Sequence, residues 1–181
     1  MTKKTTEKKP SAKNANGTIP PQGDETNTSP LTVNAQYIKD LSFENPSAIS
    51  HIMGGQEAPE ISIHIEAQAH NLVDRTFEVV LRIQVEASRK EGKVFILELE
   101  YAGLFTIGGD VPEEYIRPIL MVECPRILFP FARNIVASIT QDAGYPSLLL
   151  TPVDFADLYQ RQLAEEHAAL AEKQKEKPTI Q

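Results

Sequence analysis

Residues Phe77 to Tyr101 read FEVVLRIQVEASRKEGKVFILELEY, and this stretch decides the fold. Apolar and polar side chains alternate on both sides of the short segment Arg89-Lys90-Glu91-Gly92. Successive side chains of a strand point to opposite faces of the sheet, so alternation with a period of two predicts strands that have one wet face. The short segment between the two strands predicts an antiparallel hairpin.

Two more alternating segments precede this hairpin. The first runs from Val33 to Glu44; its odd positions are predicted to be the apolar face, with Lys39 as the exception, and its even positions the polar face, with Ile38 as the exception. The second is predicted from about residue 60 to 70, with its apolar side chains facing inward. Four half-apolar strands in succession predict an antiparallel sheet with one covered face.

The period of the apolar residues changes after the sheet. Phe131, Ile135 and Ile139 recur every four residues, which predicts an amphipathic helix over about 129–142 that stops at Gly144. A last helix is predicted to begin near Asp154, a favourable cap residue. Before these helices, Asp110 is predicted to cap a short turn that Pro118 limits. Strands followed by helices indicate the α+β class.

The composition divides the chain into three parts. Residues 1–30 hold almost no large apolar side chain and are predicted to be a disordered tail. Residues 31–163 are predicted to form one folded domain, and the charged residues 164–181 to extend the last helix before it frays. The link over 45–59 is long and carries Gly54-Gly55, and loops of that length are usually functional or mobile.

Charge and cysteine content exclude several classes of function. The formal net charge of −7 argues against nucleic-acid binding, which depends on a basic surface. One cysteine, Cys124, allows no intrachain disulfide and fits a reducing compartment. There is neither an apolar run long enough to span a membrane nor the apolar segment of a secretory signal, so we expect a cytoplasmic protein.

The sequence shows no constellation that would support catalysis. His64 and His70 share the polar face of a strand but lie about 20 Å apart, too far for one metal ion. Cys124 lies in an apolar stretch and is predicted to be a small buried hydrophobe. The two glycine pairs belong to no phosphate-binding motif. We therefore expect no enzymatic activity and no metal site.

Long strands with few helices leave apolar surface that needs a partner. A second copy of the chain is the simplest partner, so a symmetric oligomer is expected. The first long helix is apolar over a broad arc, and the residues predicted at the oligomer interface are Phe131, Ile135, Val136 and Ile139.

Five segments of the chain, in one order and spacing, resemble the SecB family of protein-export chaperones. They are Tyr37–Glu44 (YIKDLSFE), Phe77–Arg82 (FEVVLR), Gly103–Ile107 (GLFTI), Cys124–Arg133 (CPRILFPFAR) and Pro146–Phe155 (PSLLLTPVDF). The resemblance covers about residues 33–163. It implies a four-stranded antiparallel sheet with helices, assembled as a dimer of dimers, with no cofactor and no ATPase activity of its own.

The resemblance also implies partners. A SecB-type holdase binds unfolded preproteins in the cytoplasm and transfers them to the export ATPase, SecA. Family members contact the basic tail of that ATPase through an acidic patch, and the matching positions here are Asp40, Glu44, Ile96 and Glu98. The alternation places Asp40 and Glu44 on the polar face of the first strand, and Ile96 and Glu98 together on one face of the fourth.

A client groove is implied between the long loop, the edge of the sheet and the last helix. The matching residues are Ile49, Ile52, Met53, Ile61, Ile63, Phe155, Leu158 and Tyr159. The strand and helix members of this set are equally well explained as ordinary core residues.

Two other functions remain open at this point. A SecB-like fold could serve the antitoxin of a toxin–antitoxin pair, although the acidic patch favours export. A small-ligand carrier or enzyme would need a closed pocket with converging polar groups, for which the sequence gives no sign.

Overall fold

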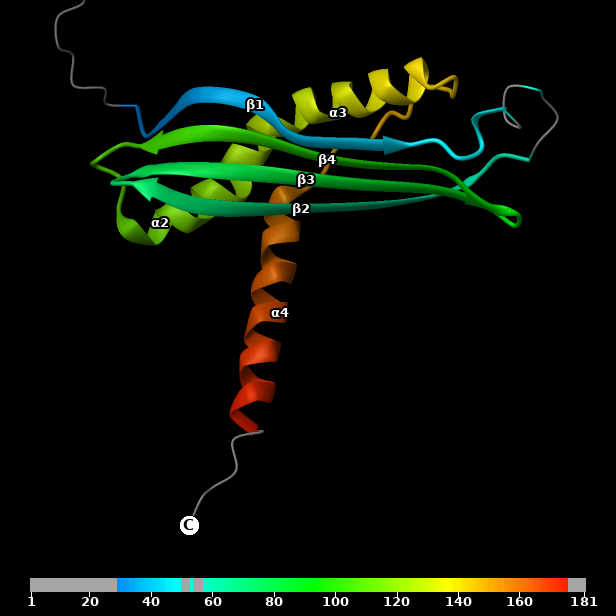
Figure 1. The fold of residues 1–181 in the computed structure, drawn as a ribbon. Coiled ribbons are helices and arrows are strands. Elements are labelled where there is room, and N and C mark those ends of the chain that lie inside the picture. The colour runs from blue at the N-terminus through cyan, green and yellow to red at the C-terminus, as the bar shows by residue number, and fades with distance from the viewer. Residues whose placement is uncertain (1–28, 50–52, 54–56, 176–181) are drawn as a thin grey trace, which may run out of the picture.

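The computed structural model describes residues 29–49, 53 and 57–175, with side chains as far as residue 168. Four antiparallel strands form one sheet: β1 (Leu31–Glu44), β2 (Glu60–Val73), β3 (Thr76–Arg89) and β4 (Gly92–Ile107). Their order across the sheet is β1-β4-β3-β2, so β1 and β2 lie at opposite edges (Figure 1). The predicted α+β class and antiparallel sheet are confirmed.

The turns explain this strand order. Gly92, at φ 139°, begins β4 directly after the turn from β3, as the hairpin prediction required. The turn between β2 and β3 is equally short, and Asp74 there adopts a positive φ of 48°. The link from β1 to β2 must instead pass from one edge of the sheet to the other, across about 14 Å of strand spacing. This crossing requires the length of the segment after Glu44.

Two bulges in β1 change which of its side chains share a face. The register against β4 shifts between Val33 and Ala35 and again between Ile38 and Asp40. Ile38 therefore lies opposite Tyr101 on the helix side, and Tyr37 lies opposite Ala102 on the outer side. The predicted assignment of odd and even positions to two faces is wrong for these residues, because each bulge inserts one residue and reverses the alternation beyond it.

The helical region begins earlier than the sequence pattern indicates. Helical backbone continues from α2 (Glu113–Pro118) through the π-helical turn η1 (Ile119–Glu123) into α3 (Cys124–Asp142). Pro112 occupies the cap position of α2, so the predicted cap at Asp110 and the predicted start near residue 129 are both wrong. A π turn adds a residue to the helical repeat, so the apolar pattern before it is out of step with the pattern after it.

The ends of α3 and α4 agree with the predictions. Gly144, with a positive φ of 89°, follows the last residues of α3. At the start of α4 (Phe155–Lys175), the carboxylate of Asp154 accepts hydrogen bonds from the backbone N–H groups of Ala156 (3.0 Å) and Asp157 (3.2 Å). Such a cap contributes about 0.5–2 kcal/mol to helix stability.

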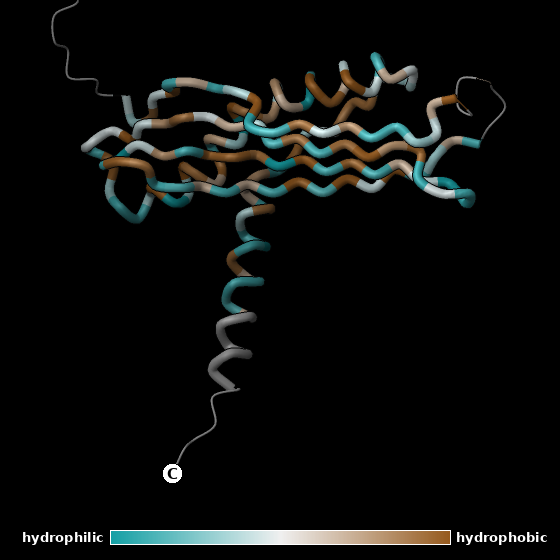
Figure 2. Tube along the Cα trace, in the orientation of Figure 1, coloured by the Kyte–Doolittle hydropathy of each residue, from teal (hydrophilic) through white to brown (hydrophobic). Residues whose placement is uncertain are grey.

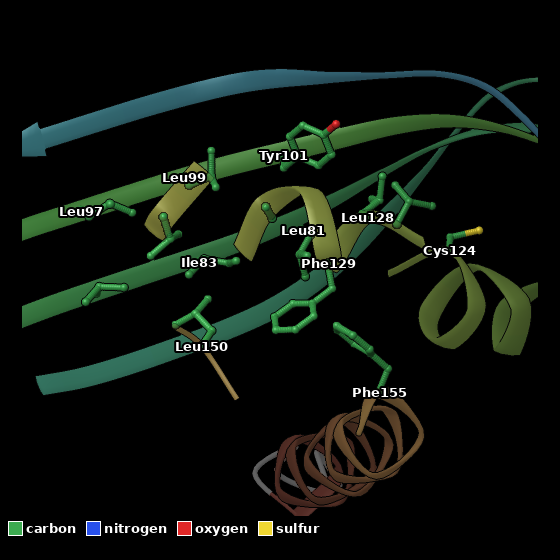
Figure 3. Packing of buried hydrophobic residues seen from close by; sticks show 14 of the residues in the cluster. Leu81, Ile83, Leu97, Leu99, Tyr101, Cys124, Leu128, Phe129, Leu150 and Phe155 are labelled. Carbon is green, nitrogen blue, oxygen red and sulfur yellow. The ribbon is translucent and has the colours of Figure 1, made fainter. Parts of the chain in front are cut away.

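The core lies between the sheet and α3, which crosses one face of the sheet, whereas α4 extends away beyond the β2 edge (Figure 1). Apolar residues alternate along the strands (Figure 2), and those on the helix side pack against Leu128, Phe129 and Leu150 (Figure 3). Gly103 in β4 lets α3 approach closely, because an added Cβ would lie 2.9 Å from Leu128 Cδ2. In the part of the chain that the structure describes, no helix is both long and apolar enough to cross a bilayer.

Candidate interaction surfaces

The four predicted docking residues lie together on the outer face of the sheet, away from α3. Strand pairing places Asp40 opposite Glu100, Ser42 opposite Glu98, and Glu44 opposite Ile96. Directly paired residues of antiparallel strands project from the same face. The three carboxylates predicted for docking are exposed, and Ile96 and Glu98 line a shallow hollow of about 200 Å³.

Four other acidic groups on this face, Glu66, Glu78, Glu86 and Glu100, are paired with cations of the same chain. Arg82 lies between two carboxylates: its Nη1 is 3.2 Å from Glu66 Oε1, and its Nε donates to Glu100 Oε1 at 2.9 Å. Both carboxylates raise the pKa of the Arg82 guanidinium, and the hydrogen bonds to Glu100 have the largest effect. The Nζ of Lys93 is 3.1 Å from Glu86 Oε2.

A second cluster of paired side chains lies on the neighbouring part of the outer face. Lys39 Nζ donates to Glu78 Oε2 at 2.7 Å, and the Tyr37 hydroxyl donates to the other oxygen of the same carboxylate. These two bonds, that of Lys39 first, lower the pKa of Glu78. The bond to Glu78 raises the pKa of Tyr37 to about 12, so its hydroxyl stays protonated and continues to donate.

Asp40, Glu44 and Glu98 differ from these paired groups. Among the residues with described side chains, none of the three has a Lys, Arg or His within ion-pair distance. Glu98 accepts only a neutral bond, from the Gln84 amide at 3.2 Å. These three negative charges are therefore uncompensated, whereas Glu66, Glu78, Glu86 and Glu100 on the same face are balanced. Glu60, at the start of β2, is also exposed on this face and has no ion pair among the described side chains.

The residues predicted for the client groove do not form one groove. Met53, 82% exposed, and the exposed Ile49 belong to the long link, and Ile52 lies outside the described residues. Ile61 and Ile63 are about two-fifths exposed on the helix side of β2. Three members pack with the core instead: Phe155 and Tyr159 are buried and Leu158 is partly buried.

Phe155 illustrates the core role. It is 1% exposed, and its ring meets that of Phe129 edge-on at 5.8 Å between centroids (Figure 3). A side chain so enclosed anchors the start of α4 and has no surface to offer a client.

A larger groove lies further along β2 and was not predicted. It has a volume of about 890 Å³ and is bounded by the second half of β2, by α2 and η1, and by α4. Its apolar wall includes Ala67, Ala69, Phe77, Ile116, Leu120 and Met121. Four acidic residues are among the polar residues around it: Glu66, Glu113, Glu165 and Glu166. Among the described residues predicted for the client groove, none lines it, because sequence periodicity did not place α2 and η1 beside β2.

Arg117 fixes α4 at the border of this groove. Its Nη2 lies 2.7 Å and 2.6 Å from the two carboxylate oxygens of Glu166, and its guanidinium carbon is 5.9 Å from the centroid of the Tyr159 ring. Both neighbours raise the pKa of the Arg117 guanidinium, and the hydrogen bonds to Glu166 have the largest effect. One side chain of α2 thereby holds two turns of α4 in position.

The residues predicted at the oligomer interface divide between core and surface. Val136 is fully buried and cannot reach a partner, and Ile135 and Ile139 are partly buried against the core. Phe131 is 51% exposed, and its ring stacks on Tyr101 at 6.3 Å between centroids. Beside it, the edge strand β1 exposes three apolar side chains on the same side of the sheet: Val33, Ile38 and Leu41.

Cys124 is fully buried, as predicted. Desolvation by burial, followed by the nearby charge of Glu123, raises the pKa of its thiol to about 12. At neutral pH the thiol is therefore protonated and out of reach of solvent, which is the setting of a structural cysteine and not of a nucleophile.

Comparison with known proteins identifies the family. A model of the preprotein translocase subunit SecB matches residues 24–166. The protein-export protein SecB of Rhodospirillum centenum is 50% identical over 139 residues, covering 77% of this chain and 83% of that protein. That of Maricaulis maris is 52% identical over 139 residues, covering 77% and 80%. That of Nitrobacter hamburgensis is 47% identical over 160 residues, covering 88% and 98%.

A solved structure supports the same fold. The SecB-like chaperone of Mycobacterium tuberculosis, in complex with an antitoxin peptide, superposes with a TM-score of 0.51 at 16% identity, covering 68% of this chain and 90% of that one. At this identity the likeness concerns the fold alone, whereas the relatives that are about half identical all carry the protein-export name. The family match and these relatives together establish that the chain belongs to the SecB family.

Proposed function

We propose that this chain is a cytoplasmic holdase that keeps unfolded preproteins competent for export and delivers them to the export ATPase, SecA. Membership of the SecB family makes it a protein-export chaperone. The proposal adds that it works as a dimer of dimers and docks on the ATPase through Asp40, Glu44, Ile96 and Glu98.

The observation that best supports the docking surface is that some carboxylates of the outer sheet face are paired with cations and others are not. Glu66, Glu78, Glu86 and Glu100 each have a cation within ion-pair distance. Asp40, Glu44 and Glu98 have none among the described side chains, so their charges are free to attract a basic partner. Attraction of this kind accelerates encounter and weakens as salt is added.

The groove beside β2 supports the client-binding part of the proposal. An unfolded chain exposes apolar side chains and unpaired backbone groups. The groove offers an apolar wall that contains the adaptable side chain of Met121. β2 is also an edge strand, so its outer backbone groups are available for pairing with an extended segment.

The exposed apolar side chains of β1 and α3 support the assembly. Ile38 on the edge strand β1 and Phe131 on α3 are each about half exposed, and among the described residues no strand lies on the outer side of β1. A twofold contact between two copies would cover both the apolar side chains and the strand edge. The remaining contacts of a dimer of dimers would then form on other surfaces.

Docking is tested by Glu98→Lys, with Glu114→Lys as the matched control. Both residues are exposed and both substitutions change the charge by the same amount, but Glu114 lies on α2, away from the outer face. We measure binding to the isolated basic tail of the ATPase at low salt. Loss of one exposed attraction and gain of one repulsion should weaken binding by about 2- to 30-fold for Glu98→Lys.

Glu114→Lys should bind the tail as the unchanged protein does. Both variants should retain oligomer mass and affinity for a permanently unfolded polypeptide. If Glu98→Lys bound the tail with unchanged affinity at low salt, the docking surface would lie elsewhere.

A further inference from the structure

A second hollow, of about 520 Å³, lies between the end of β4 and the other side of the α2–η1 segment. Its walls are apolar and rigid: Val111, Pro112, Tyr115, Pro118, Ile119 and Val122. Tyr115 is the aromatic member of this set, and proline-containing extended peptides dock against aromatic side chains. Neither the docking face nor the groove beside β2 includes any of them.

The start of the folded domain lies in this hollow. Pro30 and Gly108 belong to its lining, and the Gly108 N–H donates to the Pro30 carbonyl at 3.1 Å. The contact is close: a Cβ added to Gly108 would lie 2.8 Å from the carbonyl oxygen of Ser29. The point from which residues 1–28 depart is therefore fixed at the wall of the hollow.

The preceding sequence contains one segment that suits an apolar hollow. Between Met1 and Ser29, Ile19 is the only large aliphatic side chain, and Pro20-Pro21 follow it directly. Two consecutive prolines favour an extended polyproline conformation, so little entropy is lost when such a segment binds.

The tether between this segment and the hollow is short. Residues 22–29 can span up to about 28 Å, enough to leave the wall and return to it. A flexible connection of this length gives an effective concentration on the order of millimolar, so even an intrinsic Kd of about 1 mM would leave the hollow half occupied.

Charge favours the same contact. Residues 1–28 carry five lysines against Glu7, Asp24 and Glu25, a net charge of 5 − 3 = +2. The hollow is also lined by the exposed carboxylates of Asp110 and Glu123, the latter paired with Arg126 at 2.9 Å. Because Glu123 is paired, the Asp110 carboxylate is the charge that adds an attraction for the lysines of residues 1–28.

We propose that Ile19-Pro20-Pro21 docks into the hollow of its own chain, with the Ile19 side chain beside Tyr115 and Ile119. The N-terminal segment would then cover an apolar surface that the folded domain leaves open. The inference is independent of client binding and of ATPase docking, because it uses neither of those surfaces.

The test is methyl NMR of the full-length protein with isotope-labelled isoleucine side chains. Ile19 is the probe, and Ile180, which lies two residues after Pro178 near the other end of the chain, is the internal control. Docking should displace the Ile19 methyl signal from the position of Ile180, because the Tyr115 ring shifts nearby signals. Tyr115→Ser, at a side chain 54% exposed and so compatible with folding, should abolish most of this displacement.

A second variant tests the segment itself. Replacing Pro20 and Pro21 with glycine should move the Ile19 signal toward that of Ile180 without touching the folded domain. The displacement should not change on dilution, because docking occurs within one chain. An Ile19 signal that coincides with Ile180 and ignores Tyr115→Ser would overturn the proposal, and so would a displacement that disappears on dilution.

Discussion

Gly103→Ala tests how the sheet and α3 are held together. Gly103 lies on the helix side of β4, where an added methyl group would lie 2.6 Å from Cε2 of Phe105 and 2.9 Å from Cδ2 of Leu128. Both of those side chains are fully buried, so neither can turn outward to make room. One of them must shift within a packed core.

The magnitude follows from two opposing terms. Overpacking of a core costs about 1–3 kcal/mol. Replacing glycine with alanine also restricts the unfolded chain, which stabilises the fold by about 0.4–1 kcal/mol. The difference is a net loss of roughly 1–2 kcal/mol. For a chain of this size each kcal/mol shifts Tm by about 2–4 °C, so Tm should fall by about 2–8 °C.

The control is Gly109→Ala, the same chemical change in open space. No atom lies within 4 Å of the Cβ that would be added there. This variant should be neutral or slightly more stable than the unchanged protein. Urea unfolding at fixed protein concentration measures both variants. Equal stability of the two would show that the approach of α3 to β4 does not limit the packing.

Of four further predictions, two concern the thiol, one the assembly and one the groove. Cys124, with a pKa raised to about 12, should not react with an aromatic disulfide reagent at neutral pH until urea unfolds the chain, and fast reaction of the native protein would contradict its burial. The same raised pKa implies that stability is full below the unfolded thiol pKa of about 8.5 and declines as the pH rises from there toward 12, which unfolding curves at several pH values can check. Phe131→Asp should shift the light-scattering mass below the 4 × 20.1 = 80.4 kDa of four chains, and an unchanged mass would place the interface elsewhere. Met121→Glu should remove about 1.4 kcal/mol of apolar contact from the groove and so weaken binding of a labelled unfolded polypeptide about tenfold. Docking on the ATPase should not change.

The parts of the fold that rest on local chemistry were predictable. The alternation from Phe77 to Tyr101 and the turn at Gly92 determine a hairpin, because period and turn geometry act over a few residues. The cap at Asp154 is equally local, since its carboxylate binds backbone N–H groups two and three residues ahead.

Irregular backbone was not predictable. The bulges of β1 and the π turn of η1 each insert a residue into a regular repeat, and composition does not mark where the repeat slips. Their consequence is large: one bulge decides that Tyr37 lies on the outer face beside Glu78, and that Ile38 lies on the helix side.

The acidic face was predicted only in part. The family match indicated Asp40, Glu44, Ile96 and Glu98, and the pairing of β1 with β4 brings them to one face. The order of the strands decides that Arg82 balances Glu66 and Glu100. Asp40, Glu44 and Glu98 are left without such a partner among the described side chains. The groove beside β2 depends in the same way on the packing of η1 and α4.

The sequence by itself determined the class of fold, the strands and their turns, and the family, because these are carried by periods and motifs within short segments. Only the tertiary structure decided which charges remain unpaired, which apolar side chains are core and which are surface, and where the grooves lie. These properties arise between residues far apart in the chain, such as Arg117 and Glu166, and depend on how the elements pack in space.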